Sequence, residues 1–474
     1  MKSKVLKATS WSLLQRVGTM CISFVTNMLL ARLLTPSDFG CLGLILTFVS
    51  IADLLVDAGL GQSLIQKQNI DKNDISTVFT TNILLSIAFF SIIFLIAPLV
   101  ESYTEIINLA IYLRVEAVSI ILRSLYVVHN ALLNKQLNFK ALATVNIGGS
   151  LVSSAIAIVM ALYGLGIWSL IGKNLIMHFT FFILYRFFVN FEFSLYINKK
   201  SFKELFSFGW FVSLSSFIDL AYSNIATFII GKRYTVEQLG YYTQAHNLKQ
   251  IPVYSLSMVI SQVLFPMFSK EQNNRERIKL SAQKIITLAT AIIFPLMLCL
   301  IVVAEPLIVL LYSDKWLHSV PYFRILCVAG LVNILIHINR SILMALGLSK
   351  SLFKVQLTAI IIGIVLMIIA LQYDVLVFII SIALYSFVNW LLVAIKTGKN
   401  INYGIFNQIK DISASLLIAI VTTTVSIYIM NLMAIESVII SLIVNVSVYT
   451  SIYVLLHLVL NTQAIKIIKS QIKR

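Results

Sequence analysis

Long apolar segments follow one another along this chain, and only short connections separate them. A helix needs about 20 apolar residues to cross the ~30 Å hydrocarbon core of a bilayer. Fourteen segments meet that length, at residues 8–34, 39–60, 77–100, 107–133, 141–163, 166–189, 205–231, 241–268, 283–312, 321–346, 351–371, 375–397, 412–433 and 437–460. Only 12% of the residues are charged, against about 25% in soluble proteins. The sequence therefore predicts an all-α integral membrane protein with about 14 transmembrane helices.

The first apolar segment is predicted to stay in the mature protein. Lys2, Lys4 and Lys7 precede it, as in a signal peptide, but it is too long for the apolar region of one, and no small-residue cleavage site follows. No connection between segments is long enough for a folded extramembrane domain. The last dozen residues form a basic tail.

The distribution of Lys and Arg predicts the orientation of the spans. One set of alternate connections, together with both termini, holds 25 of these residues, whereas the opposite set holds Arg32, Lys232, Arg233 and Lys315. Short loops rich in Lys and Arg stay in the cytoplasm. Both termini are therefore expected in the cytoplasm. This asymmetry also accounts for the net charge of +17 without a nucleic-acid partner.

Short matches between the first and second groups of six spans indicate an internal repeat. The turn at residues 32–40 (RLLTPSDFG) corresponds to residues 232–240 (KRYTVEQLG), and Tyr112 with Arg114 corresponds to Tyr322 with Arg324. Repeats of this kind form two bundles around a central cavity, related by a pseudo-two-fold axis. The predicted parts are an N-terminal six-helix lobe (1–190), a cytoplasmic linker (191–204), a C-terminal six-helix lobe (205–397), two additional helices (398–460) and a cytoplasmic tail (461–474).

Seven cations remain inside the predicted spans. A central Arg or Lys costs about 2.5–3.5 kcal/mol in a lipid-facing helix, so such residues face water or a counter-ion. Arg16, Arg123 and Arg340 lie deepest and are the first candidates for binding an anionic substrate. Arg114, Lys173 and Lys249 lie nearer the outer surface, where long side chains also reach interfacial water. Arg324 lies at the outer boundary, where snorkelling explains it best.

Acidic and polar side chains accompany these cations. Glu116, Ser119, Arg123, Tyr126 and Asn130 recur at helical spacing and share one face. Glu116 and Arg123 are two turns apart, so they pair only partially. Such stripes indicate a hydrated interior, although the Ser and Thr among them also suit contacts between helices. Asp53, Glu116 and Asp219 are candidates for pairing with the cations or for coupling transport to H+ or Na+.

Motifs for other chemistry are missing from the sequence. It contains no P-loop, no HExxH zinc motif and no nucleophile elbow. Its four cysteines lie inside apolar spans without the spacing of metal ligands. We predict that the chain is not an enzyme and carries no metal or cofactor.

Ordered short motifs resemble bacterial polysaccharide transporters of the teichuronic-acid and colanic-acid exporter type. They belong to the flippase superfamily that also contains multidrug extruders and lipid II flippases. The matching segments are residues 11–16 (WSLLQR), 30–40 (LARLLTPSDFG), 57–61 (DAGLG), 64–67 (LIQK), 137–140 (LNFK), 164–168 (GLGIW), 201–209 (SFKELFSFG), 239–242 (LGYY), 265–266 (FP), 294–295 (FP) and 315–316 (KW). Coverage extends to about residue 397. Arg16 is the one cation of the predicted site that lies in a matching segment.

The resemblance implies a flippase in the bacterial cytoplasmic (inner) membrane. It would move polyprenyl-pyrophosphate-linked oligosaccharides from the cytoplasmic to the outer leaflet, for capsule, O-antigen or exopolysaccharide synthesis. Membrane lipids, a polysaccharide polymerase and glycosyltransferases are then its expected partners. Guanidinium groups in an alternating-access cavity suit a pyrophosphate. The alternative is an antiporter of the multidrug-extruder type, coupled to a cation, which should have an acidic, aromatic cavity. The excess of cations over acids in the spans favours the flippase, and the buried charges disfavour a passive scaffold.

Overall fold

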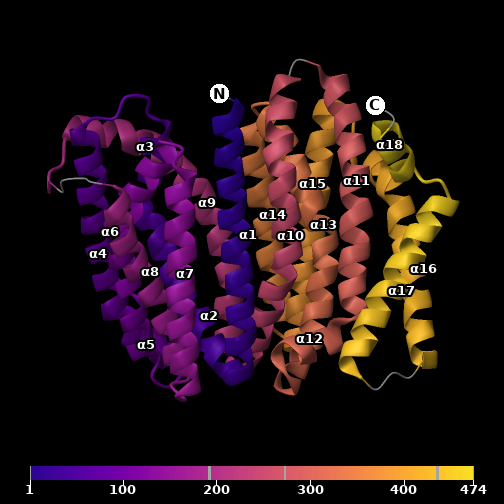
Figure 1. Ribbon diagram of the computed structural model, residues 1–474, viewed down its shortest axis with the longest axis horizontal. Coiled ribbons are helices and arrows are strands. Elements are labelled where there is room, and N and C mark those ends of the chain that lie inside the picture. Colours follow the sequence, from indigo (N-terminus) through magenta and orange to yellow (C-terminus); the bar gives the residue numbers. More distant parts are fainter. Residues whose placement is uncertain (1, 190–193, 272–273, 434–436, 473–474) are drawn as a thin grey trace. The chain divides into compact units, whose positions relative to one another are not determined.

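The computed structural model describes residues 2–189, 194–271, 274–433 and 437–472, and within them it contains helices but no strands (Figure 1). The chain divides into two compact units, Met1–Gly240 and Tyr241–Arg474. The helices of the first unit are α1 (Lys2–Leu33), α2 (Pro36–Asp57), α3 (Leu60–Gln66), α4 (Lys72–Thr104), α5 (Leu109–Glu116), α6 (Val118–Lys135), α7 (Phe139–Leu162), α8 (Ile167–Phe188) and α9 (Lys199–Arg233). Helix α10 (Val236–Lys270) begins in the first unit and continues into the second.

The second unit contains the remaining helices. These are α11 (Arg275–Val302), α12 (Ala304–Tyr312), the 3₁₀ helix η1 (Asp314–Ser319), α13 (Val320–Ala345), α14 (Ser349–Ala370), α15 (Val375–Ile401), α16 (Ile405–Met433), α17 (Val438–Val459) and α18 (Gln463–Ile472). Within this unit, α12 lies at the end opposite to α18 (Figure 1).

The structure confirms the predicted class of an all-helical membrane protein. Among the described residues, 11 helices are long and apolar enough to cross a bilayer. The other three predicted segments coincide with the α5–α6 pair, with α9 and with α10, and the last two have 35 residues each. Each of the fourteen apolar segments therefore corresponds to a helix or to a broken pair of helices.

Two of the predicted spans are interrupted. The segment 283–312 is divided between α11 and α12 at Val303. Proline has no N–H group to donate to the carbonyl oxygen of the residue four positions earlier. For Pro306 that residue is Val302, the last residue of α11. The segment 107–133 is divided between α5 and α6 at Ala117, directly after Glu116.

The two turns that matched in the sequence adopt the same local structure. At the start of α2, Thr35 N donates to Asp38 Oδ2 at 2.9 Å, and Asp38 N donates to Thr35 Oγ1 at 3.3 Å. At the start of α10, Thr235 N donates to Gln238 Oε1 and Gln238 N to Thr235 Oγ1, both at 3.1 Å. Each pair is a capping box, which satisfies backbone donors at the first helical turn.

The glycines that follow these capping boxes bring the starts of α2 and α10 into backbone contact. A Cβ atom on Gly40 would overlap the Val236 carbonyl oxygen, and one on Gly240 would overlap the Pro36 carbonyl oxygen. Small residues allow this close approach between membrane helices. The two corresponding turns therefore pack against each other.

Prolines inside α4 and α11 each leave a carbonyl without its helical partner, because proline has no N–H group. For Pro98 that carbonyl belongs to Phe94, and it accepts a hydrogen bond from Arg114 Nε at 3.1 Å. For Pro295 it belongs to Ala291, and it accepts a hydrogen bond from Tyr453 Oη on α17 at 3.0 Å. Side chains from other helices thus replace the missing donors.

Candidate functional site

The polar interior of the first unit centres on an ion pair between Arg123 and Asp53. Arg123 lies in the second turn of α6, and Asp53 lies one turn before the end of α2. Arg123 Nη1 is 2.6 Å from Asp53 Oδ2. The Arg123 side chain is 41% exposed and that of Asp53 is 14% exposed. The guanidinium group therefore has a counter-ion and is still accessible to a ligand.

The end of α2 places a second carboxylate beside this pair. Ala58 and Gly59 adopt left-handed conformations, which end α2 at Asp57 and start α3 at Leu60. Asp57 Oδ1 then accepts a hydrogen bond from the Gly61 backbone at 3.3 Å. Asp57 is therefore engaged with the first turn of α3, as expected for a polar residue at a helix end.

Glu116 is buried at the end of α5 and does not share the ion pair of Arg123. Its Oε1 accepts a hydrogen bond from Asn174 Nδ2 on α8 at 3.2 Å. Its Oε2 is buried without a hydrogen-bond partner, and none of the ion pairs among the described residues includes it. A buried carboxylate without a cation is costly, and the predicted coupling role of Glu116 stays a prediction.

The same helices contribute a polar and aromatic pair that the sequence analysis did not identify. Tyr126 Oη lies 2.7 Å from His178 Nδ1, and the Tyr126 ring stacks on Tyr185 with 5.4 Å between centroids. Asn174 and His178 are one helical turn apart on α8, where Asn174 contacts the end of α5 and His178 contacts α6. That spacing was visible in the sequence, although the pairing with α6 was not.

The remaining predicted cations of the first unit lie apart from this pair. Arg16 is exposed on α1, a helix that packs mainly on α7. Lys173 is half-buried on α8, next to Asn174. Arg114 donates to the Phe94 carbonyl, and its guanidinium group lies 4.3 Å from the centre of the Phe94 ring. This contact gives Arg114 a structural role in completing α4.

The second unit holds the other two predicted cations. Lys249 is buried on α10, with 4% of its surface exposed, and Arg340 is half-buried on α13. The side chain of Asp219, on α9, lies outside the described residues. From the predicted set, the structure therefore brings Arg123 and Asp53 into contact, whereas Glu116 contacts Asn174. The assignment of all these residues to substrate binding stays a prediction.

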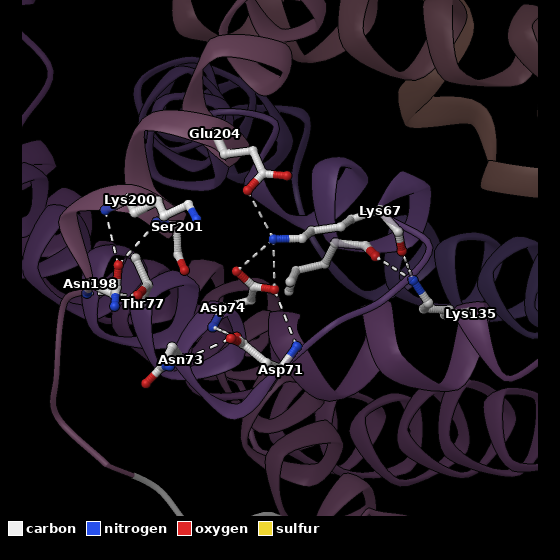
Figure 2. Close-up of polar contacts among 11 residues, drawn as sticks. Lys67, Asp71, Asn73, Asp74, Thr77, Lys135, Asn198, Lys200, Ser201 and Glu204 are labelled. Atoms are coloured by element: carbon white, nitrogen blue, oxygen red, sulfur yellow. Dashed lines mark hydrogen bonds and ion pairs between the residues drawn. The ribbon is translucent and has the colours of Figure 1, made fainter.

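Figure 2 shows a second polar network of the first unit. Lys67 Nζ is 3.0 Å from Asp74 and 3.0 Å from Glu204, and Lys135 donates to the backbone carbonyls of Leu64 and Lys67. Ser63 Oγ donates to the Leu205 carbonyl at 2.8 Å. These contacts bind the start of α9 to α3, α4 and α6.

The segment before α9, which the sequence predicted as a linker, follows α4 in its described part. Asn198 N donates to Thr77 Oγ1 at 2.9 Å, and Tyr196 N donates to Thr80 Oγ1 at 3.1 Å. Residues 194–204 are therefore attached to the first unit. The contacts of residues 196–205 with α3 and α4 were missed because those partners are more than 100 positions apart in the sequence.

We expect the Lys67→Met substitution to lower the free energy of unfolding by about 1–2 kcal/mol, because two hydrogen bonds to carboxylates are lost. Burial alone would lower the pKa of Lys67, but its hydrogen bonds to Asp74 and Glu204 outweigh burial and raise the pKa above 10.5. The stabilisation should therefore be complete at neutral pH and disappear as the pH rises above about 10.5.

Thermal unfolding of the purified protein between pH 7 and pH 11 measures this difference. Lys72→Met is the matched control, because Lys72 is exposed at the start of α4, beside the network. A Lys67→Met defect that persisted unchanged at the most alkaline pH would contradict the assignment to these ion pairs.

Comparisons with known proteins bear on the chain as a whole. The family model described as "Polysaccharide biosynthesis protein" matches residues 29–321. A Klebsiella pneumoniae "uncharacterized membrane protein in cps region" is 27% identical over 350 residues, which are 73% of this chain and 72% of that protein. The "Teichuronic acid biosynthesis protein TuaB" of Bacillus subtilis is 24% identical over 353 residues, with coverage of 73% and 72%.

Two solved structures share the fold. The lipid II flippase MurJ in an inward closed conformation superposes with a TM-score of 0.75 at 14% identity, covering 95% of this chain and 99% of MurJ. An inward-facing multidrug resistance MATE transporter superposes with a TM-score of 0.63 at 15% identity, covering 82% and 98%. At these identities, both superpositions show a shared fold.

Proposed function

Because this chain belongs to the family of polysaccharide biosynthesis proteins and has the fold of a membrane flippase, we propose that it flips a polyprenyl-pyrophosphate-linked oligosaccharide. The repeat unit would move from the cytoplasmic to the outer leaflet of the cytoplasmic membrane, where capsule, O-antigen or exopolysaccharide chains are assembled. The relatives support a role in polysaccharide synthesis, and the charged interior supports the chemical class of the substrate.

The accessible guanidinium group of Arg123 is the observation that carries this proposal. A pyrophosphate presents several oxygen atoms to which a guanidinium group donates two hydrogen bonds at once. In the structure Asp53 occupies one edge of that group, at 2.6 Å. The substrate would replace Asp53 as the counter-ion of Arg123 while its polyprenyl tail stays in the lipid.

Carboxylates near Arg123 suggest how transport is coupled. We propose that Asp53 and Glu116 take up H+ or Na+ when the substrate occupies Arg123, and Asp219 is a third candidate. Glu116 supports this role because its Oε2 is buried without a hydrogen-bond partner. The two six-helix lobes predicted from the sequence, with both termini in the cytoplasm, would then alternate access between the two leaflets.

Flipping in proteoliposomes tests the function directly. The substrate is a fluorescent undecaprenyl-pyrophosphate oligosaccharide, and an impermeant glycan-cleaving enzyme added outside reports its transfer between leaflets. We expect protein-dependent transfer that empty liposomes do not show. No transfer with any glycolipid, together with exchange of organic cations for H+ or Na+, would instead identify a multidrug-type antiporter.

A further inference from the structure

A polar pocket lies in the second unit, between the helices of the predicted lobe and the two additional helices. Its volume is about 670 Å³. The wall on the lobe side includes Glu305 of α12 and Arg324 of α13. The wall on the other side includes Asn431 of α16 with Ser441 and Asn445 of α17. Neither the fold nor the proposed transport step accounts for it.

The pocket lies near the ends of the helices that line it. Arg324 is the fifth residue of α13, Asn431 is two residues before the end of α16, and Asn445 is the eighth residue of α17. At 1.5 Å per residue, these side chains lie within roughly 10 Å of their helix ends. The polar layer on each side of the hydrocarbon core is about 5–8 Å thick. The pocket is therefore within reach of lipid headgroups.

The lining offers one cation and one anion that are not paired with each other. Arg324 Nε donates to the Ile301 carbonyl at 3.3 Å, which leaves its terminal amino groups for another acceptor. Both Arg324 and Glu305 are exposed, and among the described residues no ion pair joins them. A ligand that carries both an anionic and a cationic group would complement this pair.

Asn445 adds an acceptor that lacks a donor. Its side chain is 5% exposed, and its Nδ2 donates to the Ser441 carbonyl at 2.9 Å. Its Oδ1 is buried with no hydrogen-bond partner among the described residues. Buried acceptors of this kind are rare in native structures, so the Asn445 oxygen indicates a ligand that donates N–H or O–H groups.

We propose that this pocket binds the headgroup of phosphatidylethanolamine, with the phosphate at Arg324 and the primary ammonium group at Glu305. The ammonium group also supplies the N–H donors that Asn445 lacks. Phosphatidylcholine has no N–H group on its headgroup, and phosphatidylglycerol has no cation. The pocket should therefore prefer phosphatidylethanolamine over both. This proposal does not depend on which substrate is transported.

The repeat provides an internal control for Arg324. Arg114, its counterpart, also donates its Nε to a backbone carbonyl of the preceding span, that of Phe94. However, its guanidinium group lies over the Phe94 ring, and the neighbouring pocket is lined by Phe90, Ser91, Phe94 and Leu95 without a charged residue. Loss of Arg114 should therefore disturb the helices as loss of Arg324 does, without removing a headgroup site.

Native mass spectrometry of the detergent-solubilised protein, titrated with each of the three phospholipids, tests the proposal. We expect Arg324→Gln to weaken phosphatidylethanolamine binding about tenfold, since one charge-assisted contact is lost. Arg324→Lys should retain part of the binding. Glu305→Gln should remove the preference over phosphatidylcholine and phosphatidylglycerol, and Arg114→Gln should change binding less than twofold.

Four results would overturn the assignment. The wild-type protein could bind all three phospholipids equally, or Arg324→Gln and Arg114→Gln could weaken binding to the same extent. Displacement of phosphatidylethanolamine by a soluble repeat-unit oligosaccharide would assign the pocket to a glycan instead. A folded Arg324→Gln protein that bound phosphatidylethanolamine like the wild type would also exclude the site.

Discussion

Replacing Arg123 by glutamine is expected to lower the rate of glycolipid flipping roughly 10- to 100-fold, because hydrogen bonds to a charged group contribute about 1.5–3 kcal/mol. Glutamine keeps a donor but removes the charge and the second N–H edge. Arg123→Lys keeps the charge and should have an intermediate rate. The measurement is the flipping assay in proteoliposomes, at equal amounts of reconstituted protein.

The ion pair with Asp53 requires a control for folding. Removing Arg123 also leaves Asp53 without its partner at 2.6 Å, so a loss of rate could follow from instability. The exchanged pair Arg123→Asp with Asp53→Arg should recover thermal stability, whereas flipping should stay low because the guanidinium group then projects from α2. Arg275→Gln removes an exposed cation at the start of α11 and should leave flipping unchanged.

Two outcomes of this series would separate the site from the function. Flipping that survives in folded Arg123→Gln protein would keep the flippase and exclude Arg123 as its anion site. Full activity in the exchanged pair would mean that a cation is needed in this region but that its helix of origin is unimportant.

Alanine at Gly40 or Gly240 is expected to destabilise the protein by about 1–3 kcal/mol, and leucine by more, because overpacked contacts force the backbone apart. At both glycines the added Cβ would overlap a carbonyl oxygen of the other helix, at Val236 or at Pro36. A backbone atom cannot rotate away as a side chain can. The loss of stability is measured as a lower melting temperature in detergent. Size-exclusion chromatography of heated samples gives this temperature.

Gly148→Ala is the matched control for these substitutions. Gly148 lies within α7, and a Cβ there would meet only the end of the Leu184 side chain, at 3.3 Å. Alanine also favours a helix over glycine by up to about 1 kcal/mol, so this variant should melt at or above the wild-type temperature. Equal melting temperatures for Gly40→Ala, Gly240→Ala and Gly148→Ala would show that α2 and α10 are not in backbone contact.

The sequence predicted the helices well because hydropathy and length alone decide which segments can cross a bilayer. It also matched the turns at residues 32–40 and 232–240 as a repeat, and the structure shows that both begin a helix with a capping box. The break at Val303 was missed even though Pro306 was visible in the sequence. For the break at Ala117 the sequence contained no proline or glycine signal.

The candidate site was predictable only in part. Helical periodicity places Arg123 and Glu116 on one face, but it does not show which helix lies opposite. The partner of Arg123 proved to be Asp53, 70 positions earlier, and Glu116 instead meets Asn174 of α8. Assigning Arg114 from the sequence required recognising that Pro98 frees the Phe94 carbonyl, which then needs a donor from another helix.

The prolines inside α4 and α11 free one carbonyl in each unit, and the two units bind that carbonyl in different ways. In α4, the carbonyl that Pro98 frees is bound by Arg114, from the helix that follows directly. In α11, the carbonyl that Pro295 frees is bound by Tyr453, from the second of the additional helices. An unsatisfied carbonyl costs several kcal/mol in lipid. Helix α17 therefore stabilises α11 at Pro295. A bend at Pro295 requires α17 to move with α11 or the hydrogen bond from Tyr453 to break.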